Sequence, residues 1–264
     1  MMQPGAPEPQ KKPVLVITSQ VVRGGISGRG LTFALERIGH DVWFLPTILL
    51  PWHPGQGKGT RIVPPAADFE AIAGDLAASP KLSEIGAVIS GYLGSAAQAG
   101  PIAALGKAVK SANPDAPYLC DPIMGDHHGD THGGDGTLYV PEPTAEAIRD
   151  ELVPLADIVT PNAFELGWLT GHDVDIETRV LAAARALGPE RVLVTSSPAL
   201  RRNAIANVLA GPRGAIAAEH ATIPNPPHGT GDLIAGLYLS NLMAGQDDEE
   251  ALKQASASVF ELVA

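Results

Sequence analysis

A glycine-rich turn runs directly into an acid and an apolar helix near the end of the sequence. The turn and acid are His228-Gly229-Thr230-Gly231-Asp232, and LIAGLYLSNLM follows. Glycine costs conformational entropy on folding, so two glycines favour a backbone that approaches a bound group closely. The first N–H groups of a helix attract anions, and a carboxylate there can accept a proton. The stretch predicts an anion site with Asp232 as a candidate base, whereas an N-cap or first-turn acid is the structural alternative.

Further polar residues stand where predicted strands end. In a parallel sheet these ends meet at one edge, which is where open α/β sheets bind ligands. Each residue also has a structural alternative: Asp121 precedes a proline and fits a turn, and Asn162 and Glu165 have the spacing of a capping box. The residues expected at this edge are Ser19, Gln20, His53, Gly91, Tyr92, Asp121, Thr160, Asn162, Glu165, Thr195 and Ser196.

Three acids and several hydroxyls around a helix N-terminus suit phosphoryl transfer. That reaction depends mainly on positioning and charge neutralisation. It needs carboxylates that hold hydrated Mg²⁺, an array of donors for the moving phosphoryl group and a base near the acceptor hydroxyl. Asp232 and the adjoining glycine turn could supply the base and the donor array together.

Two other glycine-rich segments fit nucleotide-binding motifs poorly. RGGISGRG (23–30) follows the first predicted strand, but its glycines do not give G-x-G-x-x-G, and the second strand lacks the acid that binds a ribose. In PGQGKGT (54–60), Trp52 occupies the place of the first P-loop glycine and Gly59 follows Lys58. Neither a Rossmann dinucleotide site nor a P-loop is therefore expected.

Short β-branched runs alternate with longer amphipathic runs along the whole chain. This order predicts a three-layer α/β fold with a mostly parallel central sheet and helices on both faces. A long loop is expected at 122–136, a hairpin at 204–221 and two helices at the end. Strands are predicted at 14–19, 41–48, 86–93, 116–121, 157–161 and 191–197, and helices at 31–38, 67–79, 98–110, 143–152, 162–170 and 176–187.

Length, charge and cysteine content narrow the class of protein. The 264 residues, 45% of them hydrophobic, fit one domain at 13–264 after a flexible leader at 1–12. A net charge of −11 argues against nucleic acid or an anionic membrane as the partner, and no apolar run approaches the roughly 20 residues of a membrane span. The one cysteine, Cys120, allows no internal disulfide, which favours the cytoplasm. We expect Cys120 to be a small core residue.

Several motifs resemble those of one enzyme family. GTGD (229–232) resembles the G-x-G-D signature of ribokinase-like small-molecule kinases, and the chain more narrowly resembles pyridoxal kinases from Val14 to its last residue. The segments that carry this resemblance are ITSQVVRG (17–24), VISGYLGSAAQ (88–98), VKSANPDAPYLCDPIMGD (109–126) and DIVTPNAFELGWLTG (157–171).

The resemblance implies a cytoplasmic homodimer that phosphorylates the 5′-hydroxymethyl of pyridoxal with MgATP, with a monovalent cation such as K⁺ as a further candidate cofactor. It implies that Asp232 is the catalytic base and that the amides of Gly229, Thr230 and Gly231 form the anion hole. The implied substrate contacts are Ser19, His53, Tyr92 and Asp232. The implied ATP and Mg²⁺ contacts are Asp121, Thr160, Asn162, Glu165 and Thr195, with Asp121 and Glu165 acting on Mg²⁺ through water.

The sequence also departs from the family pattern. Gln20 replaces a common histidine, Pro54 replaces a threonine, and Thr195 stands where some members carry a lysine. Members usually continue beyond the position of Ala264, which implies a further C-terminal segment. The loop at 125–136 is rich in histidine, and a lid over the phosphates is favoured over a transition-metal site. The candidate metal ligands there are His127, His128, Asp130 and His132.

Two other functions stay open. A hydroxymethylpyrimidine kinase shares the fold and the G-x-G-D motif, although the SGYLG and CDPIMGD contexts favour pyridoxal. A protein that binds pyridoxal or its phosphate without catalysis is the rival from another class. Asp232 with both of its glycines argues against that rival.

Overall fold

A computed structural model describes residues 11–127, 136–224 and 226–264. An eight-stranded sheet forms the centre, in the order β10-β9-β8-β7-β4-β3-β1-β2. All neighbouring pairs from β2 to β8 are parallel, whereas β9 is antiparallel to both β8 and β10. The strands are β1 (Lys11–Val21), β2 (His40–Leu50), β3 (Ala87–Ser90), β4 (Tyr118–Cys120), β7 (Ile158–Val159), β8 (Arg191–Pro198), β9 (Ala204–Gly211) and β10 (Gly214–Ala221).

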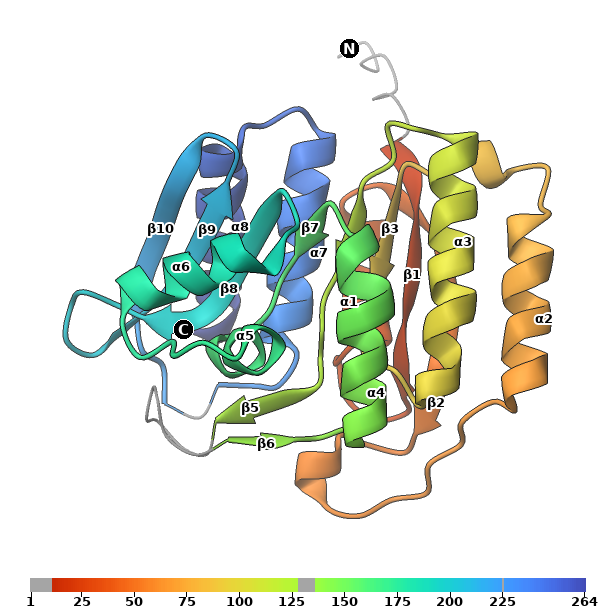
Figure 1. Ribbon diagram of the computed structural model, residues 1–264, viewed down its shortest axis with the longest axis horizontal. Coiled ribbons are helices and arrows are strands. Elements are labelled where there is room, and N and C mark those ends of the chain that lie inside the picture. Colours follow the sequence, from red (N-terminus) through yellow and green to blue (C-terminus); the bar gives the residue numbers. More distant parts are fainter. Residues whose placement is uncertain (1–10, 128–135, 225) are drawn as a thin grey trace, which may run out of the picture.

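Helices cover both faces of this sheet (Figure 1). The main helices are α1 (Gly28–Arg37), α2 (Ala66–Ala77), α3 (Ala99–Ala112), α4 (Glu142–Ala147), α5 (Ala163–Thr170), α6 (Glu177–Leu187), α7 (Thr230–Met243) and α8 (Asp248–Val263). The three-layer α/β fold with a mostly parallel sheet is thus confirmed. The predicted hairpin is β9–β10, and the two helices that close the chain are α7 and α8.

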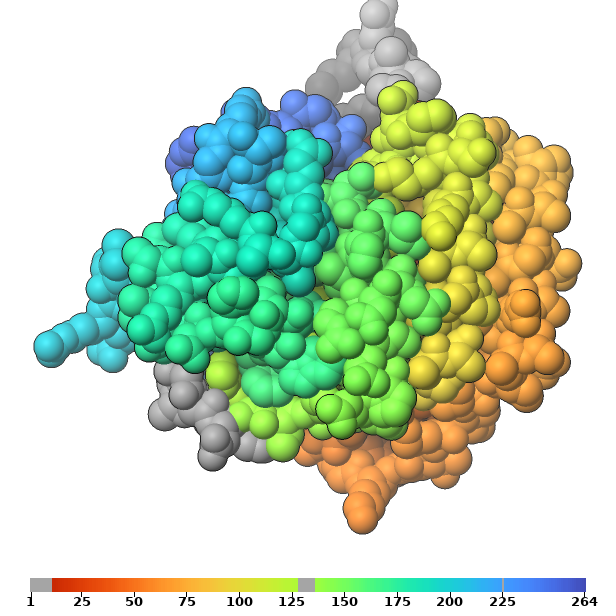
Figure 2. Space-filling model, in the orientation of Figure 1, coloured from red at the N-terminus to blue at the C-terminus, as the bar shows by residue number. Residues whose placement is uncertain are grey.

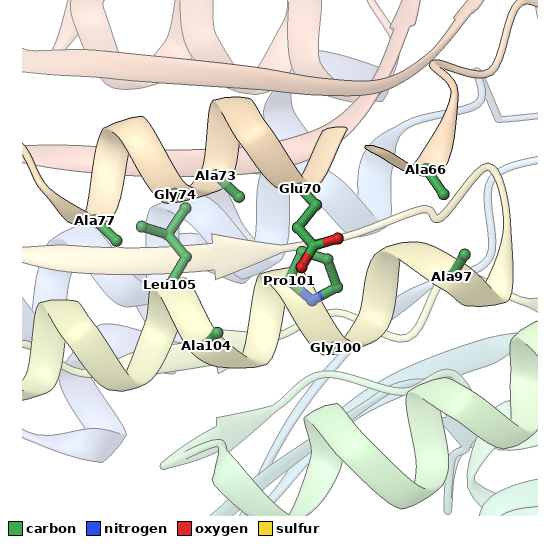
Figure 3. Close-up of a pocket in the computed structure, with 10 residues that line it drawn as sticks. All are labelled: Ala66, Glu70, Ala73, Gly74, Ala77, Ala97, Gly100, Pro101, Ala104 and Leu105. Carbon is green, nitrogen blue, oxygen red and sulfur yellow. The ribbon is translucent and has the colours of Figure 1, made fainter. Parts of the chain in front are cut away.

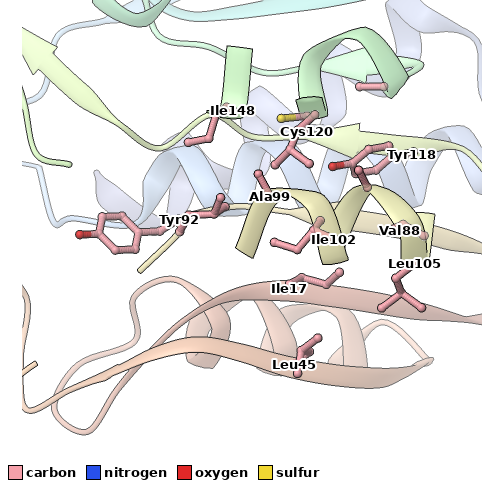
Figure 4. Close-up of a cluster of buried hydrophobic side chains, with 14 of the residues drawn as sticks. Ile17, Leu45, Val88, Tyr92, Ala99, Ile102, Leu105, Tyr118, Cys120 and Ile148 are labelled. Atoms are coloured by element: carbon pink, nitrogen blue, oxygen red, sulfur yellow. The ribbon is translucent and has the colours of Figure 1, made fainter. Parts of the chain in front are cut away.

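Side chains of successive residues in β1 point into two separate apolar cores, one on each face of the sheet. Leu15 and Ile17 pack with residues of α2, α3 and α4 on one face, where Figure 4 shows Ile17 with Ile102 and Leu105 of α3. Val14 and Val16 pack with α1, α7 and α8 on the other face. All four side chains are fully buried, as expected for a parallel strand covered on both sides. Figure 2 shows that helices and loops between residues 66 and 190 hide β1 on the first face.

The predicted loop at 122–136 contains one short strand and the first residue of another, so the expectation of irregular structure there was wrong in part. β5 (Gly125–His127) pairs antiparallel with β6 (Gly136–Leu138). A Cβ at Gly125 or Gly136 would lie within 2.3 Å of the Phe164 ring, so glycine lets that ring pack against the strand pair. Packing therefore requires glycine at 125 and at 136. His128, Asp130 and His132 lie outside the described residues.

The first strand includes the last two residues of the expected N-terminal leader. β1 begins at Lys11, inside the expected leader at 1–12, and the rest of that leader lies outside the described residues. Within the part of the chain that the structure describes, none of the helices is both long and apolar enough to cross a membrane.

Candidate active site

The carboxyl ends of the central strands bring the predicted polar residues together. Ile17 of β1 pairs with Ser90 of β3, Ser90 pairs with Cys120 of β4, and Cys120 pairs with Val159 of β7. The next residues along each chain segment therefore lie side by side at one edge of the sheet. Ser19, Asp121 and Thr160 are all buried there.

Asp232 lies in the first turn of α7, immediately above this edge. The N-cap of α7 is Gly229, which has a φ of 96° and provides no side-chain cap. Asp232 is therefore not the N-cap but the third residue of the helix, which is the first-turn position that the structural alternative also allowed. Its side chain is buried, and burial raises its pKa to about 7 even though the backbone N–H groups of Ser27 and of Asp232 itself lower it. A carboxyl with this pKa can accept a proton near neutral pH.

The two glycines of the turn have different surroundings. A Cβ at Gly229 would lie 3.3 Å from the Ile26 Cα, and its φ of 96° disfavours other residues. A Cβ at Gly231, in contrast, would have no heavy atom within 4 Å. Gly229 is thus required by the fold of the turn itself, whereas Gly231 borders open space into which a ligand could fit.

Asp121 lies close enough to Asp232 for their charges to interact. Burial raises the pKa of Asp121 well above its usual value, and the nearby Asp232 raises it further. The Thr160 hydroxyl donates a hydrogen bond of 2.9 Å to Asp121 Oδ1, which partly opposes this rise. Among the residues that the structure describes, neither acid forms a salt bridge with lysine or arginine.

Glu165 is held by backbone groups from two segments. The N–H of Asn162 donates to its Oε2 (2.8 Å), and the N–H groups of Met124 and Gly125 donate to its Oε1 (2.9 and 3.3 Å). Asn162 Oδ1 in turn accepts from the Glu165 N–H, which completes the predicted capping box of α5. Burial, and then the charge of Asp121, raise the pKa of Glu165 well above its usual value. Glu165 therefore fixes the turn after β4 to the start of α5.

The loop after β2 closes the other end of the site. The imidazoles of His53 and His228 stack with their centroids 3.9 Å apart. His53 Nδ1 also accepts a hydrogen bond from the Gly55 N–H, which caps a 3₁₀ turn at Pro54–Gln56. Pro54 thus begins this turn, a position where its missing N–H costs nothing. The stack joins the loop after β2 to the residue that precedes the glycine turn.

Tyr92 is buried and has a partner that the sequence did not reveal. Arg61 Nη2 donates to the Tyr92 hydroxyl at 2.8 Å, and the Tyr92 N–H donates to Thr18 Oγ1 at 3.0 Å. No sequence motif marked Arg61 as part of a site. His228 adjoins the glycine turn, and that adjacency was the one available signal for it.

Thr195 lies farther along the same edge. It forms an isolated bridge with Asn162, and its N–H donates to the Pro161 carbonyl at 2.9 Å. The pairing of β8 with β9 shifts between Val194 and Ser197. Its predicted contact with ATP stays a prediction.

A buried thiol and a surface groove do not belong to the cluster of Asp121, Glu165 and Asp232. Cys120 is buried in β4, and burial raises the pKa of its thiol to about 12, which suits the predicted core role. An open groove of about 440 Å³ between α2 and α3 is lined mainly by alanine and glycine (Figure 3). It shares no residue with the site at the sheet edge.

Comparisons with known proteins agree with this geometry. Residues 66–264 match the family model described as phosphomethylpyrimidine kinase. "Pyridoxal kinase PdxY" of Corynebacterium diphtheriae is 34% identical over 255 residues, which cover 95% of this chain and 88% of the relative. The solved pyridoxal kinase of Entamoeba histolytica is 25% identical, with a TM-score of 0.86 and coverage of 96% and 89%. That of Leishmania donovani, in complex with ADP and pyridoxamine, is 26% identical, with a TM-score of 0.86 and coverage of 95% and 85%.

Proposed function

The chain belongs to the pyridoxal kinases, within the phosphomethylpyrimidine kinase family, and we propose that it phosphorylates the 5′-hydroxymethyl of pyridoxal with ATP. The product would be pyridoxal 5′-phosphate, recovered from the free vitamin. One observation carries the proposal: Asp232 is buried at the start of α7, with its pKa raised to about 7, beside a glycine turn without a side-chain cap.

Asp232 would act as the general base. Its carboxylate takes the proton of the acceptor hydroxyl as the oxygen attacks the γ-phosphorus of ATP. The bond from that phosphorus to the bridging oxygen breaks, and ADP leaves with the electron pair. The N–H groups of Thr230 and Gly231 stand in the first turn of α7, where a helix leaves such donors unpaired. They would donate to the moving phosphoryl group.

The carboxylates also fit a divalent cation. Asp121 and Asp232 are buried like charges that interact with each other and lack a basic partner among the described residues, so a cation would stabilise their ionised forms. Oxygen donors suit Mg²⁺. We propose that Asp121 holds it, with Glu165 acting through water because its oxygens already accept three backbone N–H groups. When bound, Mg²⁺ would neutralise charge on the phosphates.

Glu165→Gln tests the magnesium assignment. Gln can keep the capping box through its amide oxygen, but its NH₂ group then faces the N–H groups of Met124 and Gly125. It also removes the charge, so the Mg²⁺ concentration for half-maximal activity should rise several-fold. An unchanged Mg²⁺ requirement would leave Glu165 with the structural role alone. The same titration, repeated in potassium and in tetramethylammonium salts, tests the proposed K⁺ dependence.

The substrate contacts of the proposal come from both ends of the site. Ser19 and Tyr92 at the sheet edge and His53 on the loop after β2 would surround the pyridine ring. Thr160, Asn162 and Thr195 would line the ATP side. We also propose a cytoplasmic homodimer, which light scattering on the purified protein and fractionation of the source cells would test.

Product formation is the direct test of the reaction. The protein is incubated with MgATP and, separately, pyridoxal, pyridoxine, pyridoxamine and hydroxymethylpyrimidine, and products are read by mass spectrometry. Asp232→Asn is assayed alongside Asp75→Asn, which changes an exposed aspartate on α2. We expect product from pyridoxal that is lost only in Asp232→Asn.

Two other results would change the proposal. Product from the pyrimidine alone would keep the mechanism and change the substrate, in line with the description of the matching family model. Binding of pyridoxal without product from any acceptor would indicate a binding protein on a kinase fold.

A further inference from the structure

The loop between β2 and α2 carries an arginine, Arg61, that contacts the predicted substrate residue Tyr92. Arg61 Nη2 donates to the Tyr92 hydroxyl at 2.8 Å. Its guanidinium carbon lies 5.9 Å from the centre of the Tyr92 ring, within the range of a cation–π interaction. Ile62, the next residue, forms a bridge with Leu49 of β2 through backbone hydrogen bonds of 2.9 and 3.1 Å. The backbone beside Arg61 is therefore attached to the central sheet.

The position of Tyr92 is fixed by two buried threonine hydroxyls. Its N–H donates to Thr18 Oγ1 at 3.0 Å, and its carbonyl accepts from Thr47 Oγ1 at 2.6 Å. Figure 4 shows the Tyr92 hydroxyl directed away from Ile17 and the other labelled core residues. The hydroxyl therefore has a fixed place at the border of the core, where the arginine meets it.

Arg61 has no acidic partner among the residues that the structure describes. None of the ion pairs there includes it, and its hydrogen bond goes to the neutral hydroxyl of Tyr92. A guanidinium carries five N–H donors, so most of them are available to a ligand. In a chain with a net charge of −11, an arginine placed in this way suits a negatively charged group.

The hydrogen bond from Arg61 also restricts the direction of the Tyr92 proton. A tyrosine hydroxyl has one proton to donate and lone pairs that accept. Because Arg61 donates to the oxygen, the proton must point elsewhere, and within the described ranges it meets no acceptor. The guanidinium and the hydroxyl therefore present two donors side by side, which bind a negatively charged oxygen best.

The order of the strands separates these two donors from the proposed ATP contacts. Tyr92 follows β3, and Arg61 lies on the loop after β2, whereas Asp121, Thr160 and Thr195 lie at the ends of β4, β7 and β8. The sheet runs β8-β7-β4-β3-β1-β2, so the donors are on the side away from the ATP contacts. The oxygen that they fit therefore belongs to the phosphoryl acceptor and not to ATP.

We propose that Arg61 and the Tyr92 hydroxyl bind the 3-hydroxyl oxygen of the vitamer, which makes Arg61 a specificity-determining residue. This inference rests on the proposed function, in which Tyr92 lines the pyridoxal pocket. At neutral pH a 3-hydroxypyridine is largely ionised at this oxygen, with the proton on the ring nitrogen. Pyridoxal, pyridoxine and pyridoxamine all carry the oxygen, whereas hydroxymethylpyrimidine has a neutral ring nitrogen at that position.

A pair of ligands isolates the contribution of this oxygen. Pyridoxine and 3-deoxypyridoxine differ only in the 3-hydroxyl, and isothermal titration calorimetry without ATP gives the Kd of each. In the wild-type protein we expect pyridoxine to bind at least about tenfold more tightly, because its absence leaves two donors unpaired. Arg61→Ala should weaken pyridoxine binding about tenfold and should change the Kd of 3-deoxypyridoxine by less than about twofold.

Two further variants separate the donors from the charge of the loop. Tyr92→Phe keeps the ring and removes the second donor, so it should lower the preference for pyridoxine by a smaller factor than Arg61→Ala. Lys58→Ala is the matched control, because Lys58 is an exposed cation of the same loop. It should leave both Kd values within about twofold of the wild type.

Three outcomes would overturn the inference. Equal losses for both ligands in Arg61→Ala would show that Arg61 holds the loop and not the oxygen. An effect of Lys58→Ala as large as that of Arg61→Ala would indicate the overall charge of the loop. A wild-type protein that binds pyridoxine no more tightly than 3-deoxypyridoxine would exclude the contact.

The calorimetry needs no turnover, so it separates this inference from the proposed reaction. Binding of pyridoxine with the expected preference, but without phosphorylated product when MgATP is added, would reject the kinase reaction and leave the role of Arg61 standing. Product formation with equal Kd values for the two ligands would do the reverse.

Discussion

Helices α5 and α7 begin at the same edge of the sheet, and each carries a buried acid at its third position. In α5 the N-cap is Asn162, and Glu165 and Asn162 cap each other reciprocally. In α7 the N-cap is Gly229, and no side chain caps the helix. The two starts therefore have similar dipoles and similarly placed acids but different caps.

The difference in caps separates a structural acid at the start of α5 from a proposed catalytic acid at the start of α7. Glu165 accepts three backbone N–H groups and fixes the turn after β4. Asp232 is buried in the first turn of α7, and Gly231 beside it borders open space. A glycine cap leaves the helix N-terminus available to a ligand, whereas an asparagine cap satisfies it.

The largest expected difference between the two starts is catalytic. Asp232→Asn should lower kcat by about 10²- to 10⁴-fold, because it removes the proton acceptor, and should leave KM within a few-fold. Steady-state kinetics with pyridoxal measures both constants. An equal loss of pyridoxal binding would instead assign Asp232 a structural role like that of Glu165.

The pH dependence of activity should show the next largest effect. Because the pKa of Asp232 in the free protein is raised to about 7, kcat/KM should fall roughly tenfold per pH unit below that value. At pH 5 it should be about 100-fold under its plateau. Asp232→Asn should lose this acidic limb, and a wild-type profile that stays flat from pH 5 to 8 would contradict the assignment of the base.

The raised pKa of Asp232 affects stability in the opposite direction to activity: stability should fall as pH rises. Between the unfolded pKa of about 4 and the folded value of about 7, the folded state binds more protons, so stability falls as pH rises through this window. Asp232→Asn should therefore raise Tm at pH 8 and leave it nearly unchanged at pH 4.

Gly229→Ala changes the cap of α7 directly. The new Cβ would meet the Ile26 Cα at 3.3 Å in a conformation with φ of 96°, so the turn must shift and kcat should fall about tenfold. Gly245→Ala is the matched control, since Gly245 has a φ of 86° after the same helix with open space around it. It should lower Tm without lowering kcat; a similar loss of kcat in both variants would point to stability alone.

Asn162→Ala makes the smallest change, at the start of α5. Losing a side-chain cap should lower the free energy of unfolding by about 1 kcal/mol, with a smaller effect on kcat than Gly229→Ala has. Asp247→Ala removes the cap of α8, which accepts from two N–H groups, and should cost a similar amount. Urea denaturation measures both. A catalytic loss as large as that of Gly229→Ala would place the start of α5 in the chemistry.

Much of the fold could be predicted because its signals are local. The β-branched runs around Val14, Val88 and Val192 mark buried strands, and Gly211 to Gly214 marks the hairpin. β5 and β6 were missed because their glycines are explained only by the Phe164 ring, which comes from a distant segment.

The site was predictable where a motif or a strand end marked it. Asp121, Asn162, Glu165 and Asp232 were placed in this way. Arg61 was missed because its partner, Tyr92, belongs to a segment 31 residues away in the sequence. Sequence spacing carries no signal for contacts of that kind.

The buried thiol of Cys120 can be used to measure how often the central sheet opens. It is the one cysteine of the sequence, it lies in β4 next to Asp121, and burial raises its pKa to about 12, so reagents react with it only when the sheet opens. The rate of thiol labelling therefore measures how often the centre of the sheet becomes exposed. Ligands that bind at Asp121 should slow this labelling, which makes occupancy of the site readable without a catalytic assay.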